Sequence, residues 1–178
     1  VVNVTNAQLG GLADSSSGVM LVGASVKGMT ASTYNSQTKN LFITSADGSV
    51  TLSGATSRTG TVCGNTVTDK NIKWLTNYTS YSVNNPQVVS TDKDEIVILW
   101  EKLNSDGRYV ESCYMVIASN GLTIQPETSM GDVRLNANEM PLYRNGKVYW
   151  IEGDGYNCYA VELNIGEFDK YNPAGETP

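Results

Sequence analysis

The sequence contains no histidine among its 178 residues. Histidine is the commonest general base of enzymes, a frequent metal ligand and the side chain that activates serine and cysteine nucleophiles. Its absence excludes Ser-His and Cys-His catalytic pairs. A phosphate-binding loop is also missing, because Gly60–Gly64 has no lysine and is not followed by a helical pattern. We therefore predict that the chain alone is not an enzyme.

Positive charge is scarce and long apolar runs are absent. The chain has 12 Lys and Arg against 18 Asp and Glu, a net charge of −6 and a pI near 4.6. This balance opposes binding to nucleic acid or to an anionic membrane surface. No apolar run approaches the roughly 20 residues that cross a bilayer, so we predict no membrane insertion. No signal-peptide pattern is present, and Val1 is interpreted as a processed start or an artificial boundary.

Cysteine is also rare, and the three that occur are too few for a scaffold held by disulfides. Two of them head a repeated segment: Cys113–Val116 recurs as Cys158–Val161, and each is followed five residues later by a glycine. A weaker copy is Asn40–Ile43. Equivalent positions of neighbouring repeats lie farther apart than the roughly 4.4–6.8 Å between Cα atoms that a disulfide needs. We expect Cys113 and Cys158 to be buried, and Cys63 to be free or to pair between chains.

Short strand-like runs fill most of the sequence, and helical periodicity is almost absent. The clearest runs are Glu95–Leu103 and Tyr109–Ala118, which flank the turn Asn104–Gly107. Asn145-Gly146 similarly separates two later runs, and a further strand is expected at Cys158–Asn164. Asn-Gly and Asp-Gly dipeptides between such runs are strong signals of β-hairpins. The sequence therefore predicts an all-β fold of antiparallel strands.

The strand-like runs group into three units within a single domain that covers residues 1–165. The units span about 1–53, 72–126 and 133–165, and residues 54–71 are interpreted as a polar insertion. Each unit begins with a lead-in strand, at residues 1–5, 72–76 and 133–136. This gives antiparallel four-stranded repeats of the size of a propeller blade. Residues 166–178 are interpreted as a C-terminal tail or linker.

These units, with a Pro-led strand, a Trp-bearing apolar strand and an Asp-Gly or Asn-Gly hairpin, resemble the blades of β-propellers. They are loosely similar to secreted bacterial propellers, including those with Asp-box motifs. Only partial Asp-box sequences occur, at Ser45–Gly48 and Asn104–Gly107. The resemblance therefore implies an architecture and transfers no catalytic residues.

Three units are fewer than the four to eight blades of closed propellers. Three arrangements stay open on the sequence alone. The chain is a half-ring that a homodimer completes, a fragment of a longer propeller, or another all-β form such as a β-sandwich.

The aromatic residues favour a binding surface, since ten Tyr and three Trp accompany only two Phe. Tyr and Trp combine a flat apolar ring with a polar edge, which suits contacts with sugars and protein partners. Trp100 and Trp150 lie in apolar strands and are predicted to belong to the core. The predicted ligand-binding residues lie in the long lead-in of the second unit and in the third unit: Trp74, Tyr78, Tyr81, Tyr143 and Tyr156.

Acidic side chains suggest two further roles. Asp-rich turns, including Asp92, Asp94 and Asp154, offer oxygen ligands for calcium, but the spacing of calcium-binding loops is missing and we expect no cofactor. Glu101 and Glu152 follow the two core tryptophans and could form a carboxylate pair of the glycosidase kind. Because they recur at equivalent positions, the interpretation is structural.

The function predicted from the sequence is a non-catalytic binding or adhesion module of an extracellular or cell-surface protein. Its most concrete form is glycan binding through exposed aromatic and Asn or Asp side chains. One alternative is a scaffold segment of a larger glycosidase-type propeller enzyme. The other is a structural module that interacts with protein.

Overall fold

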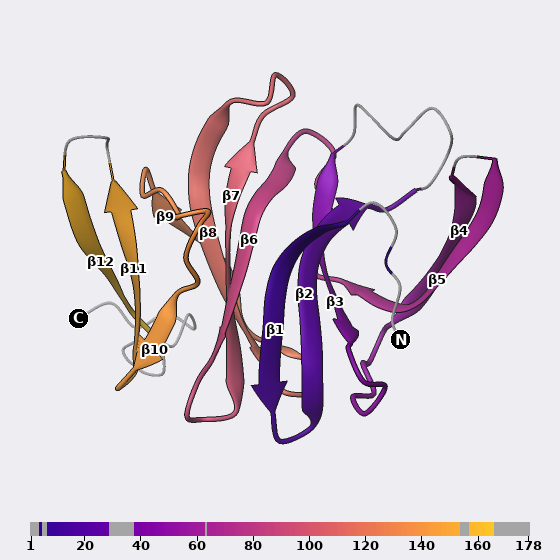
Figure 1. The fold of residues 1–178 in the computed structure, drawn as a ribbon, viewed down its shortest axis with the longest axis horizontal. Helices are drawn as coiled ribbons and strands as arrows, with labels where there is room; N and C mark the ends of the chain where they lie inside the picture. The colour runs from indigo at the N-terminus through magenta and orange to yellow at the C-terminus, as the bar shows by residue number, and fades with distance from the viewer. Residues whose placement is uncertain (1–3, 5–6, 29–37, 63, 154–156, 166–178) are drawn as a thin grey trace, which may run out of the picture.

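The computed structural model describes residues 4, 7–28, 38–62, 64–153 and 157–165, and over this part the chain is all-β with no helix (Figure 1). Every strand pairing is antiparallel, as predicted. The twelve strands are β1 (Gln8–Ser15), β2 (Gly18–Val26), β3 (Lys39–Ser45), β4 (Thr56–Val62), β5 (Asn65–Trp74), β6 (Ser82–Ser90), β7 (Glu95–Leu103), β8 (Tyr109–Ala118), β9 (Thr123–Gly131), β10 (Leu142–Arg144), β11 (Lys147–Gly153) and β12 (Cys158–Asn164).

The strands form three separate sheets that follow one another along the chain. The first sheet has the order β1-β2-β3-β5-β4, the second β6-β7-β8-β9 and the third β10-β11-β12. Only the second sheet has the predicted four strands, and in the described part of the chain none of the three closes on itself. The chain therefore consists of consecutive meanders rather than of three equal repeats.

Three strands have the bounds predicted from the sequence: β7, β8 and β12. Two other segments differ from the prediction. Residues 54–71, interpreted as an insertion, contain β4 and most of β5, which extend the first sheet. The predicted lead-in strand at 133–136 is not a strand, and most of the one at 1–5 lies outside the described residues.

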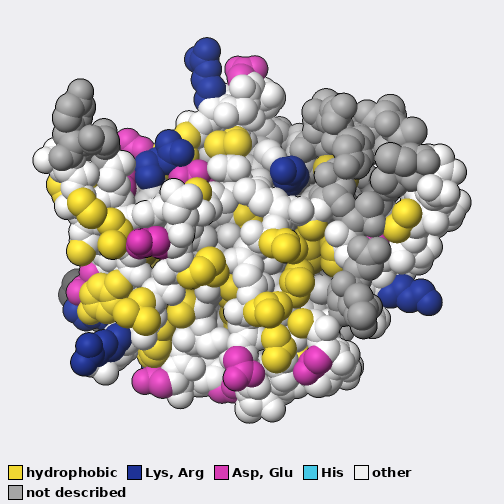
Figure 2. All heavy atoms as spheres, in the orientation of Figure 1, with side chains coloured by type: hydrophobic (Ala, Val, Ile, Leu, Met, Phe, Trp, Pro, Cys, Tyr) yellow, Lys and Arg dark blue, Asp and Glu magenta, His cyan; other side chains and the backbone are white. Residues whose placement is uncertain are grey.

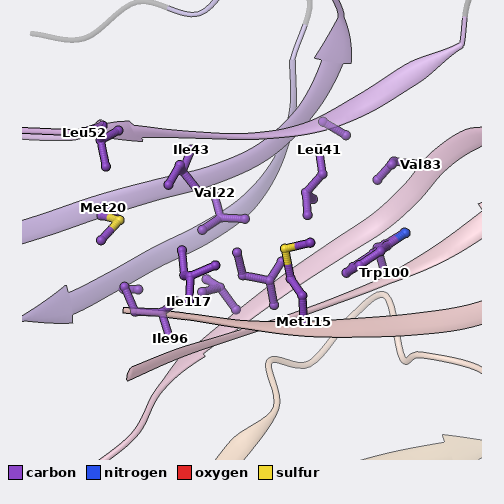
Figure 3. Close-up of a cluster of buried hydrophobic side chains, with 14 of the residues drawn as sticks. Met20, Val22, Leu41, Ile43, Leu52, Val83, Ile96, Trp100, Met115 and Ile117 are labelled. Carbon is purple, nitrogen blue, oxygen red and sulfur yellow. The ribbon is translucent and has the colours of Figure 1, made fainter. Parts of the chain in front are cut away.

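The three sheets pack face to face, and the second sheet is apolar on both faces. Along β7, Ile96, Ile98 and Trp100 point into the cluster shared with the first sheet, part of which is shown in Figure 3. Val97 and Leu99, which alternate with them, point into the cluster shared with the third sheet. Successive side chains of a strand point to opposite faces, so one apolar run supplies both cores. Each fully buried aliphatic side chain contributes roughly 1.5–3 kcal/mol.

The first strand of each sheet lies close to the first strand of the next, and glycine permits this approach. At Gly10, an added Cβ would lie 3.0 Å from the carbonyl oxygen of Pro86 in β6. At Gly11, which has a φ of +134°, it would lie 2.7 Å from the Cε atom of Met140. Larger residues here would push β1 away from β6 and from the segment that leads into β10.

The repeated cysteines are not equivalent in the fold, which corrects the expectation that both are buried. Cys113 is buried opposite Trp100 and faces the first sheet, whereas Cys158 is exposed opposite Gly153. Val116 and Val161, aligned by the sequence motif, meet in the same apolar cluster from opposite sides. Relative to Cys113–Val116, the copy Cys158–Val161 is therefore shifted by one residue in its sheet. Such a shift turns every side chain of the strand to the other face.

Candidate functional site

Two of the predicted aromatic residues, Tyr78 and Tyr81, lie together in the connection between β5 and β6. Their rings meet edge to face, with centroids 6.1 Å apart. Lys102 Nζ lies 5.2 Å from the Tyr78 centroid and 5.3 Å from that of Tyr81. Such cation–π contacts stabilise the orientation of the rings by roughly 0.5–1 kcal/mol at exposed sites. Tyr81 is 40% exposed, so its ring is available to a ligand.

Tyr78 anchors this pair to the core. It packs against the cluster between the first and second sheets, and its hydroxyl oxygen accepts a hydrogen bond of 3.2 Å from Nε1 of Trp100. Burial, followed by the neighbouring Glu127 carboxylate, raises the pKa of Tyr78 well above its ordinary value. The phenol therefore stays protonated and acts as a rigid support for Tyr81.

Two carboxylates hold Lys102 in place under the aromatic pair. Its Nζ lies 2.9 Å from Oε1 of Glu111 in β8 and 2.6 Å from Oε1 of Glu127 in β9. Burial alone would lower the pKa of Lys102, but the hydrogen bonds to both carboxylates outweigh it and raise this pKa. The ammonium group is thus charged and fully engaged, which makes it a positioning group rather than a base.

A polar cavity of about 460 Å³ opens beside Tyr81. It is lined by the 79–82 segment, by residues 103–107 of the β7–β8 turn and by Thr38. Hydroxyl groups dominate the lining, with the amide of Asn104 and the carboxylate of Asp106 added to them. Its volume lies within the roughly 300–1,000 Å³ of typical ligand pockets, but its lining is more polar than theirs, with Tyr81 and Leu103 as the large apolar members.

The cavity walls are held by their own hydrogen bonds. The Oδ1 atom of Asn104 accepts bonds from the backbone N–H groups of Asp106 (3.0 Å) and Arg108 (2.9 Å). On the other wall, Ser82 Oγ accepts a bond of 3.0 Å from the backbone N–H of Lys39. The turn and the neighbouring segment are therefore preorganised, which lowers the entropy cost of ligand binding.

Trp74 does not join this site, because it lies on the other face of the first sheet. Its ring packs edge to face on Phe42, with centroids 5.9 Å apart, and lies near two cations. Lys27 Nζ is 5.7 Å and Arg58 Cζ 5.5 Å from the ring centroid. Arg58 also forms a buried ion pair of 2.8 Å with Asp69. Trp74 thus helps to fasten the β4–β5 hairpin to the sheet.

Tyr143 lies at the opposite end of the sheets from the cavity. Its hydroxyl donates a 2.6 Å hydrogen bond to Oδ1 of Asp92, in the β6–β7 turn, and accepts one of 3.1 Å from the backbone N–H of Gly146. Burial and the Asp92 carboxylate raise the pKa of Tyr143. Its hydroxyl therefore ties the third sheet to the second. Tyr156 lies outside the described residues.

The Glu101 and Glu152 carboxylates both hold the segment that precedes the third sheet. Glu101, 2% exposed, accepts a bond of 2.8 Å from Nε of Arg134 and one of 3.3 Å from the backbone N–H of Leu135. Asn84 Nδ2 donates a further bond of 3.0 Å to it. Glu152 accepts a bond of 3.1 Å from the backbone N–H of Arg134. Their geometry is that of structural anchors.

The carboxylates of the Asp-rich turn between β6 and β7 form hydrogen bonds with other parts of the protein. Asp94 accepts a hydrogen bond of 2.6 Å from the backbone N–H of Ser16 and a second from the hydroxyl of that residue. Within the described ranges, no group of three or more Cys, Asp or Glu side chains is placed to hold a metal ion. The same residues contain no helix that is long and apolar enough to cross a membrane.

Sequence reasoning missed Lys102, Glu111, Glu127 and the lining of the cavity. The hairpin signal at Asn104–Gly107 could have revealed the Lys102–Glu111 pair, because the register of this hairpin places the two residues opposite each other. Glu127 comes from the next strand, and its approach depends on bulges in the β8–β9 pairing. Comparison with models of protein families, with curated proteins and with solved structures found no match for this chain.

Proposed function

We propose that the chain is a non-catalytic carbohydrate-binding module whose ligand occupies the cavity beside Tyr81. The observation that carries this proposal is the pairing of an exposed, rigidly supported aromatic ring with a hollow lined by hydroxyl, amide and carboxylate groups. A sugar ring has an apolar C–H face and a rim of hydroxyl groups. Such a ligand needs one flat ring and several fixed donors and acceptors.

The support of Tyr81 is what distinguishes it from an ordinary surface tyrosine. Its ring is braced by Tyr78 and by Lys102, and Lys102 is in turn fixed by two carboxylates. Ordering a free side chain on binding costs roughly 0.5–1.5 kcal/mol, and this bracing removes part of that cost. Asn104 and Asp106 on the opposite wall supply an amide and a carboxylate to the sugar hydroxyls.

The test begins with a screen of the wild-type chain on a glycan array, followed by calorimetry with the best ligand. Tyr81→Ala and Asp106→Ala are each expected to weaken binding about tenfold or more, as truncation of a central contact does. Tyr143→Phe, at the other end of the sheets, is the matched control and should bind as wild type does. Binding to no glycan, or equal binding by wild type and Tyr81→Ala, would reject the proposal.

We further propose that the three sheets are blade-like units of a propeller-type assembly on an extracellular or cell-surface protein. Support comes from the succession of meanders whose first strands lie side by side and whose faces pack in series. A module that binds protein is the second candidate function. It is favoured by apolar side chains left exposed on the two end sheets.

A further inference from the structure

The outer face of the first sheet exposes aliphatic side chains on β1. In the register of β1 and β2, Ala13 lies opposite Met20, and both belong to the core shared with the second sheet. The next pair, Leu12 and Leu21, therefore points away from this core. Leu12 is 63% exposed, and Leu9, on the same outer face, is 69% exposed.

The outer face of the third sheet likewise exposes aliphatic side chains, on β10 and β11. Val148 and Trp150 of β11 are buried against the second sheet, so the alternating residues Tyr149 and Ile151 face away from it. Leu142, opposite Tyr149, is 64% exposed, and Ile151 is 39% exposed. Monomeric proteins leave single aliphatic residues exposed, but two such faces at the two ends of one stack need an explanation.

The chain itself shows how such faces are covered. Twice within it, an apolar sheet face packs on the face of the next sheet, and the first strands β1, β6 and β10 lie in contact in series. The outer face of the first sheet and the outer face of the third are the two halves of one further interface of this kind. In Figure 1 the first and third sheets lie at the two ends of the row of sheets, with the second sheet between them.

Strand direction and charge favour the same pairing. β1 and β10 both run towards the lower edge of Figure 1, so the C-terminal ends of the two strands would meet. Near these ends, the exposed Asp14 lies on the outer face of the first sheet and the exposed Arg144 on that of the third. Figure 2 shows hydrophobic side chains over β1 and over β10, with acidic side chains along the lower edge. Two copies of a chain with net charge −6 repel each other overall. Attraction between Asp14 of one copy and Arg144 of the other would orient the two faces as they meet.

We propose that two copies of this chain associate head to tail. The outer face of the first sheet of each copy packs on the outer face of the third sheet of the other, with Leu9 and Leu12 against Leu142 and Ile151. Two such interfaces close the pair without leaving an apolar end face exposed. The same two faces meet twice, related by a twofold axis, so the association is isologous and closes after two copies.

The test uses sedimentation equilibrium of the purified chain, whose monomer mass is 19.2 kDa. The wild type is expected to sediment at twice this mass at micromolar concentration. Leu12→Asp and Leu142→Asp each spoil one half of every interface and should both be monomeric, with affinity lowered about tenfold or more. Ile124→Asp, on β9 and 48% exposed, is the matched control and should remain dimeric.

Mixing the two monomeric variants distinguishes this arrangement from others. The Leu12→Asp copy keeps its third-sheet face, and the Leu142→Asp copy keeps its first-sheet face, so an equimolar mixture should form one-to-one pairs. A wild type that stays monomeric at 100 µM, the concentration chosen for this assay, overturns the proposal and leaves the faces to another partner. Dimers lost only in Leu142→Asp, or a mixture without pairs, also overturn it. Circular dichroism of each variant verifies that the sheets are intact.

Discussion

At the scale of single residues, the environment of a side chain decides its chemistry more than its place in a sequence motif does. Cys113 and Cys158 begin the same four-residue pattern, yet one is 1% exposed and the other lies on an open sheet face. Burial raises the pKa of the Cys113 thiol to about 12: the nearby Lys102 ammonium opposes this rise, and the Glu111 and Glu127 carboxylates add to it. The thiolate is the reactive form, so the two cysteines should differ in reactivity.

We predict that iodoacetamide at pH 8 labels Cys158 rapidly and leaves Cys113 unmodified while the chain is folded. The reason is twofold, since Cys113 is inaccessible and its pKa lies far above the pH of the assay. A Cys63→Ser background limits the readout to these two thiols, which mass spectrometry of peptides distinguishes. In 6 M urea, an assay choice that unfolds the sheets, both should be labelled. Rapid labelling of Cys113 in the folded chain would contradict its burial.

At the scale of secondary-structure elements, the sequence was sufficient where an apolar run lies between strong turns. β7 and β8 were predicted to the residue because Asn104–Gly107 separates two such runs. β4 and β5 were not, because their Thr- and Gly-rich sequence carries little apolar alternation. These strands depend on tertiary contacts: Arg58 pairs with Asp69 and donates to Ser25 Oγ (2.9 Å) in β2. The candidate cavity was missed for the same reason, since its walls come from separate connections.

The β4–β5 hairpin should therefore loosen when Arg58 is replaced. Arg58→Ala leaves the buried Asp69 carboxylate without its ion pair and removes a cation from the face of Trp74. Removal of one partner from a buried pair costs roughly 3–5 kcal/mol. We expect faster hydrogen exchange in residues 56–72 and a red shift of Trp74 fluorescence, with β6–β9 protected as in wild type. Lys70→Ala, an exposed change in the same hairpin, is the control and should alter neither signal.

At the scale of the whole molecule, the second sheet makes the three sheets one cooperative unit. Neighbouring residues of β7 serve different cores: Ile98 packs between the first and second sheets and Leu99 between the second and third, and both are fully buried. Loss of packing on either side disturbs the strand that the two cores share. Stability should then be a property of the whole stack, as in single domains that unfold in one step.

Ile98→Ala and Leu99→Ala test this coupling, because they remove comparable side chains from opposite cores. Each is expected to lower the free energy of unfolding by about 2–5 kcal/mol, as large-to-small changes in a close-packed core do. Calorimetry should show one transition in both variants, at a Tm lowered by a similar amount. Hydrogen exchange should report the same loss of protection in the first and third sheets. Two separate transitions, with the first sheet stable in Leu99→Ala, would show instead that each interface unfolds on its own and that β7 does not couple them.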